Sequence, residues 1–272
     1  MYKFMKNFHS YHIVDCSPWP LVNSLNLMNI LLFMLMKISF FNYEYSKFLM
    51  VSILSIMLSM YLWWRDIIRE GTFQGHHTMN VVNLLKLGML MFIVSEIMFF
   101  FSFFWSYFHF SLAPDFEVSS LWPPKGVLMF NPYQIPLLNT LLLLSSGSTV
   151  TWSHHSMLNK NYYLTSLSLL MTIFLGVVFS VFQYIEYKNS IFSINDSTFG
   201  SIFFLATGFH GLHVSIGTLF LLMNLFRIMM SHYNIKHHFG FEAAAWYWHF
   251  VDVVWIYLYI FVYWLYWFFI NM

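Results

Sequence analysis

The chain has 272 residues, of which 59% are hydrophobic, 22% are aromatic and only 8% are charged. Because so few charges cannot cover a water-facing surface, the composition predicts a membrane protein that crosses the bilayer several times. The formal net charge of +1, without any cluster of Lys and Arg, excludes a nucleic-acid-binding protein. The lone cysteine, Cys16, excludes an internal disulfide and a thiolate metal site.

Several apolar runs are long enough to cross a bilayer core, which needs roughly 20 helical residues. These runs are Leu21–Met36, Phe48–Trp64, Asn83–His109, Ile135–Trp152, Tyr162–Tyr184, Phe199–Met230 and Phe241–Ile270. They predict an all-α, polytopic fold with seven transmembrane helices in a bundle. The whole chain is expected to form a single membrane-embedded domain, with residues 1–80 and 81–272 as possible sub-bundles. The first run is the least regular, because Asn23, Asn26 and Asn29 interrupt it at helical spacing.

The distribution of basic residues predicts the orientation of the chain, because Lys and Arg accumulate on the negative side of a membrane. The N-terminal side carries Lys3, Lys6, Arg65, Arg69, Lys86, Lys160, Arg227 and Lys236, and the opposite side carries Lys37, Lys47, Lys125 and Lys188. The opposite loops carry the acids Glu44, Asp115, Glu117, Glu186 and Asp196. The N-terminus is therefore expected on the negative side.

A single acid, Glu96, falls near the middle of the third apolar run. An isolated ionised carboxylate in hydrocarbon is costly. We therefore expect Glu96 to be protonated, hydrogen-bonded within the protein, or directed at a neighbouring subunit, with a possible proton role.

The sixth run places His210 and His213 three residues apart on one helical face. Such histidines could ligate a metal or haem, or they could be neutral and hydrogen-bonded to neighbouring helices. A stripe of small residues on the same run predicts a close contact with another helix. The stripe consists of Thr207, Gly211, Ser215 and Thr218.

The seventh run contains Glu242, His249 and Asp252 at positions i, i+7 and i+10, so all three project from one side of a helix. In a membrane this side must face protein. The spacing is compatible with proton exchange or a metal site, and equally with a polar network between helices that satisfies itself.

Three histidine doublets are expected on the same side of the membrane: His76–His77, His154–His155 and His237–His238. Neighbouring side chains on a helix diverge by about 100°, so a doublet is a poor bidentate ligand. Hydrogen bonds at the membrane surface are the expected role.

Aromatic and basic residues meet at two span ends. The end of the second run carries Trp63, Trp64, Arg65 and Arg69, and Arg227 and His232 close the sixth run on the same side. Tryptophan rings and guanidinium groups are favourable at the level of phosphate headgroups. A general interfacial belt and a dedicated phospholipid site both explain this composition.

The chain resembles subunit III of cytochrome c oxidase, of the mitochondrial type, in stretches that follow one another along nearly its whole length. They are YHIVDCSPWPL, WWRDIIREGTFQGHHT, SEIMFFFSFFW, LAP, WPP, NPYQIPLLNT, TVTWSHHS, ATGFHGLHV and HHFGFEAAAWYWHFVDVVW. The C-terminal tail, YWLYWFFINM, departs from the family pattern.

The resemblance implies a bundle split by a lipid-filled cleft, which packs beside subunit I and carries no catalytic residue, metal or cofactor, with haem and copper on partner subunits. It implies a non-catalytic core subunit of the terminal oxidase in the mitochondrial inner membrane, with its N-terminus in the matrix. Accessory subunits and other respiratory complexes are the further expected partners. Residues matching family positions near lipid headgroups are Trp64, Arg69, Glu70, His77, Arg227 and His232. Glu96 matches a membrane carboxylate that carbodiimides modify.

Three alternatives stay open. One is subunit III of a quinol oxidase, which shares the fold. Another is an independent proton transporter using Glu96, Glu242 and Asp252, which would require inverted repeats or broken helices. The third is a haem or copper electron carrier using His210, His213 and His249.

Overall fold

The computed structural model describes residues 10–40, 44–114, 120–122, 124, 126–127 and 129–271, with side chains up to residue 268. The chain divides into two compact units, Met1–Leu85 and Lys86–Met272, with the division inside the third helix. Its regular elements are helices, and no strand occurs among the described residues. The all-α prediction is confirmed, whereas the single domain with sub-bundles stays a prediction.

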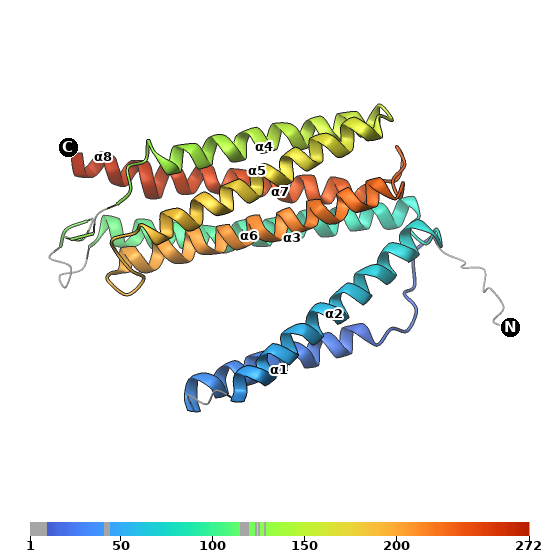
Figure 1. Cartoon of the computed structure of the whole chain (residues 1–272), viewed down its shortest axis with the longest axis horizontal. Coiled ribbons are helices and arrows are strands. Elements are labelled where there is room, and N and C mark those ends of the chain that lie inside the picture. Colours follow the sequence, from blue (N-terminus) through green and yellow to red (C-terminus); the bar gives the residue numbers. More distant parts are fainter. Residues whose placement is uncertain are drawn as a thin grey trace. The chain divides into compact units, whose positions relative to one another are not determined.

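The first unit is a pair of helices that lie side by side, α1 (Trp19–Phe40) and α2 (Glu44–Thr72) (Figure 1). The asparagines that interrupt the first apolar run join them. Asn23 Oδ1 accepts a hydrogen bond of 2.5 Å from Ser59 Oγ, and Asn26 Oδ1 accepts one of 3.1 Å from Ser55 Oγ. Side-chain hydrogen bonds between helices are favourable where water is absent. The side of α1 that carries these asparagines is therefore the side that contacts α2.

The second unit contains α3 (Met79–Leu112, which begins in the first unit), α4 (Ile135–Leu158), α5 (Tyr162–Lys188), α6 (Thr198–Met229) and α7 (Phe239–Leu258). The last helix continues through a π-helical turn, η2 (Tyr259–Trp264), into α8 (Leu265–Asn271). Helices α4 to α7 pack in sequence, and α4 also packs against α7, so the four form a closed bundle (Figure 1).

The centre of this bundle is Trp248 of α7, which is fully buried. Its indole Nε1 donates a hydrogen bond of 2.8 Å to Ser146 Oγ of α4. Gly176 and Gly217 leave room for the ring, since a Cβ atom on either would lie 2.7 Å and 2.9 Å from the indole, respectively. Gly217 thus makes the close contact of α6, whereas Gly211 of the predicted small-residue stripe faces open space.

Each predicted span lies mainly within one of the long helices, and most of the helices extend further. Six are long and apolar enough to cross a membrane by length and composition: α1, α2, α3, α5, α6 and the continuous rod Phe239–Phe268. Helix α4 does not meet that criterion, because polar residues interrupt it. A multi-pass membrane protein is the supported class. The predicted acid loops need correction at Glu44 and Glu186, which are the first residue of α2 and a buried residue in the last turn of α5.

Candidate functional site

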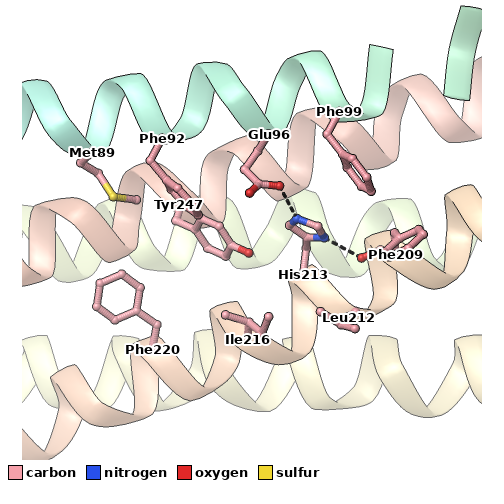
Figure 2. A pocket seen from close by; sticks show the side chains of 10 residues that line it. All are labelled: Met89, Phe92, Glu96, Phe99, Phe209, Leu212, His213, Ile216, Phe220 and Tyr247. Atoms are coloured by element: carbon pink, nitrogen blue, oxygen red, sulfur yellow. Dashed lines mark hydrogen bonds and ion pairs between the residues drawn. The ribbon is translucent and has the colours of Figure 1, made fainter. Parts of the chain in front are cut away.

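The main candidate site is a pair formed by Glu96 of α3 and His213 of α6. Glu96 Oε2 lies 2.8 Å from His213 Nε2, and both side chains point into one pocket of about 510 Å³ (Figure 2). The exposed fraction of the side chain is 23% for Glu96 and 10% for His213. Glu96 was expected to be protonated, hydrogen-bonded within the protein or directed at another subunit, and the structure shows a hydrogen bond within the protein.

The other nitrogen of His213 determines how the pair holds its proton. Nδ1 lies 2.6 Å from the carbonyl oxygen of Phe209, one turn earlier on α6 (Figure 2). A carbonyl only accepts, so Nδ1 must carry hydrogen. One further proton then lies between Nε2 and the carboxyl, either on the acid or on the ring. In both forms the pair has zero net charge, which resolves the cost of an acid inside the bilayer.

The pocket around this pair is apolar. Its other lining residues are Met89, Phe92, Phe99, Phe209, Leu212, Ile216, Phe220 and Tyr247 (Figure 2). A second, larger pocket of about 740 Å³ lies between α3 and the α7 rod, and it also has mostly aromatic and aliphatic walls. Both pockets have the character of sites for hydrocarbon chains.

The remaining residues of the predicted polar network take different partners. Glu242 Oε2 lies 2.6 Å from Lys86 Nζ of α3, and its Oε1 lies 3.2 Å from His238 Nε2. His249 lines the second pocket, with Nδ1 3.8 Å from Asp252 Oδ2.

Asp252 is nearly buried and faces α4, where a Cβ atom on Gly147 would lie 2.7 Å from its Oδ2. His210 is buried beside Trp255 and has its Nε2 3.2 Å from the carbonyl oxygen of Val251. The polar groups of α6 and α7 are thus distributed along the bundle in separate contacts.

Four of the predicted lipid residues belong to the first unit. Trp64 is exposed on α2, Arg69 Nη1 lies 3.9 Å from Asp66 Oδ1, and Glu70 lies one residue further. His77 packs on Gly71, where a Cβ atom would lie 2.7 Å from its Nδ1. Because α2 continues past the apolar run to Thr72, Arg69 and Glu70 lie on an extension of that helix, and His77 lies in the loop that follows it.

The other two predicted lipid residues lie at the end of α6. The guanidinium of Arg227 stacks on the ring of Tyr233 at 4.4 Å from its centroid, and a Cβ atom on Gly240 would lie 2.5 Å from Nη1. Arg227 Nε is buried and has no hydrogen-bond partner among the described residues. Burial and the positive charge of Arg227 lower the pKa of His232, whose backbone N–H donates to the Arg227 carbonyl at 2.9 Å.

From the sequence, Lys86 and Glu186 were expected only as charged residues on opposite sides of the membrane and not as site residues. Lys86 is the partner of Glu242, and Glu186 Oε1 accepts a hydrogen bond of 2.6 Å from Tyr263 Oη. The predicted run Tyr162–Tyr184 ends two residues before Glu186, so the sequence placed this acid in a loop and not in the last turn of α5. Lys86 pairs with Glu242 across a contact between α3 and α7. The sequence pattern of a single helix cannot predict such a contact.

Comparisons with known proteins show the family of the chain. The family model described as cytochrome c oxidase subunit III matches residues 9–267. Cytochrome c oxidase subunit 3 of Aedes aegypti is 55% identical over 246 residues, which cover 90% of this chain and 93% of that protein. The subunit of Rhipicephalus sanguineus is 53% identical over 247 residues, covering 91% and 95%. The subunit of Drosophila melanogaster is 53% identical over 246 residues, covering 90% and 93%. The chain belongs to the cytochrome c oxidase subunit III family.

Proposed function

We propose that this chain is a non-catalytic core subunit of a respiratory terminal oxidase, which transfers electrons from cytochrome c to dioxygen and pumps protons. It lies in the mitochondrial inner membrane with its N-terminus in the matrix, beside subunit I and accessory subunits. Haem and copper belong to partner subunits, and this chain has no redox centre. Family membership over nearly the whole chain is the observation that carries the proposal. The names of the relatives favour cytochrome c over quinol as the donor.

All seven long helices cross the bilayer in this proposal, including α4. Three of its polar side chains support this because they form hydrogen bonds with neighbouring helices of the bundle. Ser146 accepts from Trp248, Thr149 Oγ1 lies 2.8 Å from Thr172 Oγ1, and Ser153 donates to the Thr165 carbonyl at 3.0 Å. Part of the low hydropathy of α4 therefore arises from groups that contact protein, although Ser145, Ser148 and Thr151 are exposed.

Phospholipid is the ligand of this chain in the proposal, and its cleft is filled by lipid. The buried Nε of Arg227 without a hydrogen-bond partner supports this, because a headgroup phosphate is a strong acceptor for a guanidinium. The apolar walls of the two pockets are suited to acyl chains. Trp64, Arg69, Glu70 and His77 are proposed as further headgroup contacts on the first unit.

The lipid proposal is tested by comparing Arg227→Ala with Lys236→Ala, an exposed residue in the loop that follows the same helix. We expect the first variant to retain less phospholipid in the purified oxidase, as measured by phosphorus content and mass spectrometry. Lys236→Ala should retain the normal amount. Equal lipid content in both variants would remove Arg227 from the site.

The support role is tested by removing this subunit from the purified oxidase. We expect initial oxygen consumption with cytochrome c to persist, while proton pumping and the number of turnovers before inactivation decline. The decline is expected because, in this proposal, the chain stabilises subunit I and supports proton uptake at the mouth of a proton channel, which would lose its protein and lipid surroundings. Undiminished pumping and turnover over long assays would contradict the proposal.

A further inference from the structure

The fold brings together one histidine from each of two doublets. His154 near the end of α4 and His238 before α7 lie beside Glu242, and their ligand atoms all lie within 4.8 Å of one another. We propose that these three side chains bind a divalent transition-metal ion with the chemistry of Zn²⁺. The objection to a histidine doublet as a bidentate ligand does not apply, because each doublet contributes one ring. The proposal departs from the sequence expectation that this chain holds no metal.

The hydrogen bonding of His238 prepares its outer nitrogen as a ligand. Nδ1 lies 3.1 Å from the carbonyl oxygen of Asn234, which can only accept, so Nδ1 carries hydrogen. The neutral ring then presents the lone pair of Nε2 to Glu242 Oε1 at 3.2 Å. Two lone pairs at this distance require a cation between them, which is either a proton, as in the Glu96–His213 pair, or a metal ion. A backbone carbonyl that fixes the tautomer in this way is the usual support of a metal-bound histidine.

His154 provides the second nitrogen. Its Nε2 is buried and has no hydrogen-bond partner among the described residues, and its ring centroid lies 5.6 Å from that of His238. The ring also packs against Phe241 at 5.7 Å, so α7 limits its rotation. A buried nitrogen without a partner is unfavourable. An ion bound to His154 would satisfy it.

Lys86 pairs with the other oxygen of the Glu242 carboxylate. Its Nζ lies 2.6 Å from Glu242 Oε2, and its side chain is 38% exposed, so the flexible stem has room to move away. Lys86 therefore competes with the metal for the carboxylate. Two imidazole nitrogens and one carboxylate oxygen are a ligand set that Zn²⁺ uses in tetrahedral sites, with water in the fourth position.

The experiment is equilibrium dialysis of the purified oxidase complex against buffered Zn²⁺, with the number of ions per complex measured at each free concentration. We expect His238→Gln or His154→Gln to remove one ion, or to weaken its binding about tenfold or more. His155→Gln is the matched control, since it changes the exposed member of the same doublet. An equal number of ions and equal affinities in all four complexes would overturn the proposal.

The Lys86→Met variant distinguishes a metal site from a purely structural polar network, and it does so even if the complexes with the histidine variants fail to assemble. If Lys86 competes with the ion, its removal should tighten binding of Zn²⁺ at this site about tenfold, with nitrogen and oxygen ligands at about 2.0–2.2 Å in the X-ray absorption spectrum. If the cluster is a network without an ion, the variant gains no site and loses stability. Unchanged Zn²⁺ binding in Lys86→Met would also overturn the proposal.

Discussion

Helix α3 and the α4–α7 bundle belong largely to the same unit but are held in different ways. In the apolar window of α3 only 6% of residues are buried, whereas in that of the α7 rod 50% are buried. Within the bundle, Gly176 and Gly217 let the helices approach closely around Trp248. Contact at this distance maximises van der Waals packing, which is a main source of helix association in lipid.

Helix α3 reaches its neighbours through long side chains. Aromatic rings meet across the gap, as in Phe99 and Phe209 at 5.1 Å between centroids. Two polar contacts join α3 to the bundle, Glu96 with His213 and Lys86 with Glu242. Pockets of about 510 and 740 Å³ remain beside these contacts. A helix without close packing can therefore be held by polar pairs, because hydrocarbon offers those groups no other partner.

The largest effect is expected from His213→Leu, which leaves Glu96 in an apolar pocket without its partner. Removing one member of a buried charged or strongly hydrogen-bonded pair costs about 3 kcal/mol. Because this pair joins α3 to α6, the free energy of local opening of α3 should fall by that amount. Hydrogen exchange of α3 peptides in the purified complex measures it.

The double variant Glu96→Leu with His213→Leu is the control for this prediction. Removing both partners leaves no unpaired group, so α3 should exchange more slowly than in His213→Leu alone. If the double variant instead opens as easily as the sum of the single changes predicts, the pair does not couple the two helices.

A smaller effect is expected from Gly217→Ala in the bundle. The added Cβ would lie 2.9 Å from the Trp248 ring, which is tighter than van der Waals contact. Overpacking of this kind costs about 1–2 kcal/mol. The thermal midpoint of the complex should fall, whereas Gly211→Ala on the same helix should leave it unchanged, since nothing lies within 4 Å of that position. Equal midpoints for the two variants would show that α6 and α7 can separate without cost.

The helices were predictable because each long apolar run leaves its backbone only one way to satisfy its hydrogen bonds in lipid. Their ends were less predictable. Helix α2 continues to Thr72 and α5 to Lys188, because charged and polar residues extend a helix beyond hydrocarbon without changing its geometry. The asparagines of α1 interrupt the apolar run, yet they make the contact with α2.

The candidate site was predictable only in part. Glu96 could be recognised from the cost of its burial, but its partner His213 is on another helix, and single-helix patterns do not report such contacts. For the same reason the pairing of Glu242 with Lys86 of α3 could not be predicted, whereas His249 lies beside Asp252, as their spacing on one helix face allows. The histidine doublets give no sign in sequence that His154 and His238 meet.

The smallest effect is expected at Asp196, in the loop between α5 and α6. This residue takes part neither in the close packing of the bundle nor in the polar pairs that hold α3. The pKa of Asp196 is lowered because Ser193 donates its backbone N–H at 2.6 Å and its hydroxyl at 2.8 Å to the carboxylate. Since the folded pKa lies below the ordinary value of 3.8, the stabilisation is fully present above that pH. It is lost as the pH falls through the lowered folded pKa.

The measurement is the hydrogen-exchange protection of the Ser193 amide in the wild type and in Asp196→Asn. Wild-type protection should decrease in acid, and the variant should have lower protection that does not vary with pH. Exchange in α3 and in the bundle should stay the same in both proteins, because the loop is exposed and its contacts are local. A change in the hydrogen exchange of α3 would show instead that this loop helps to hold α3. In that case polar pairs and aromatic contacts would not be the only interactions that hold α3.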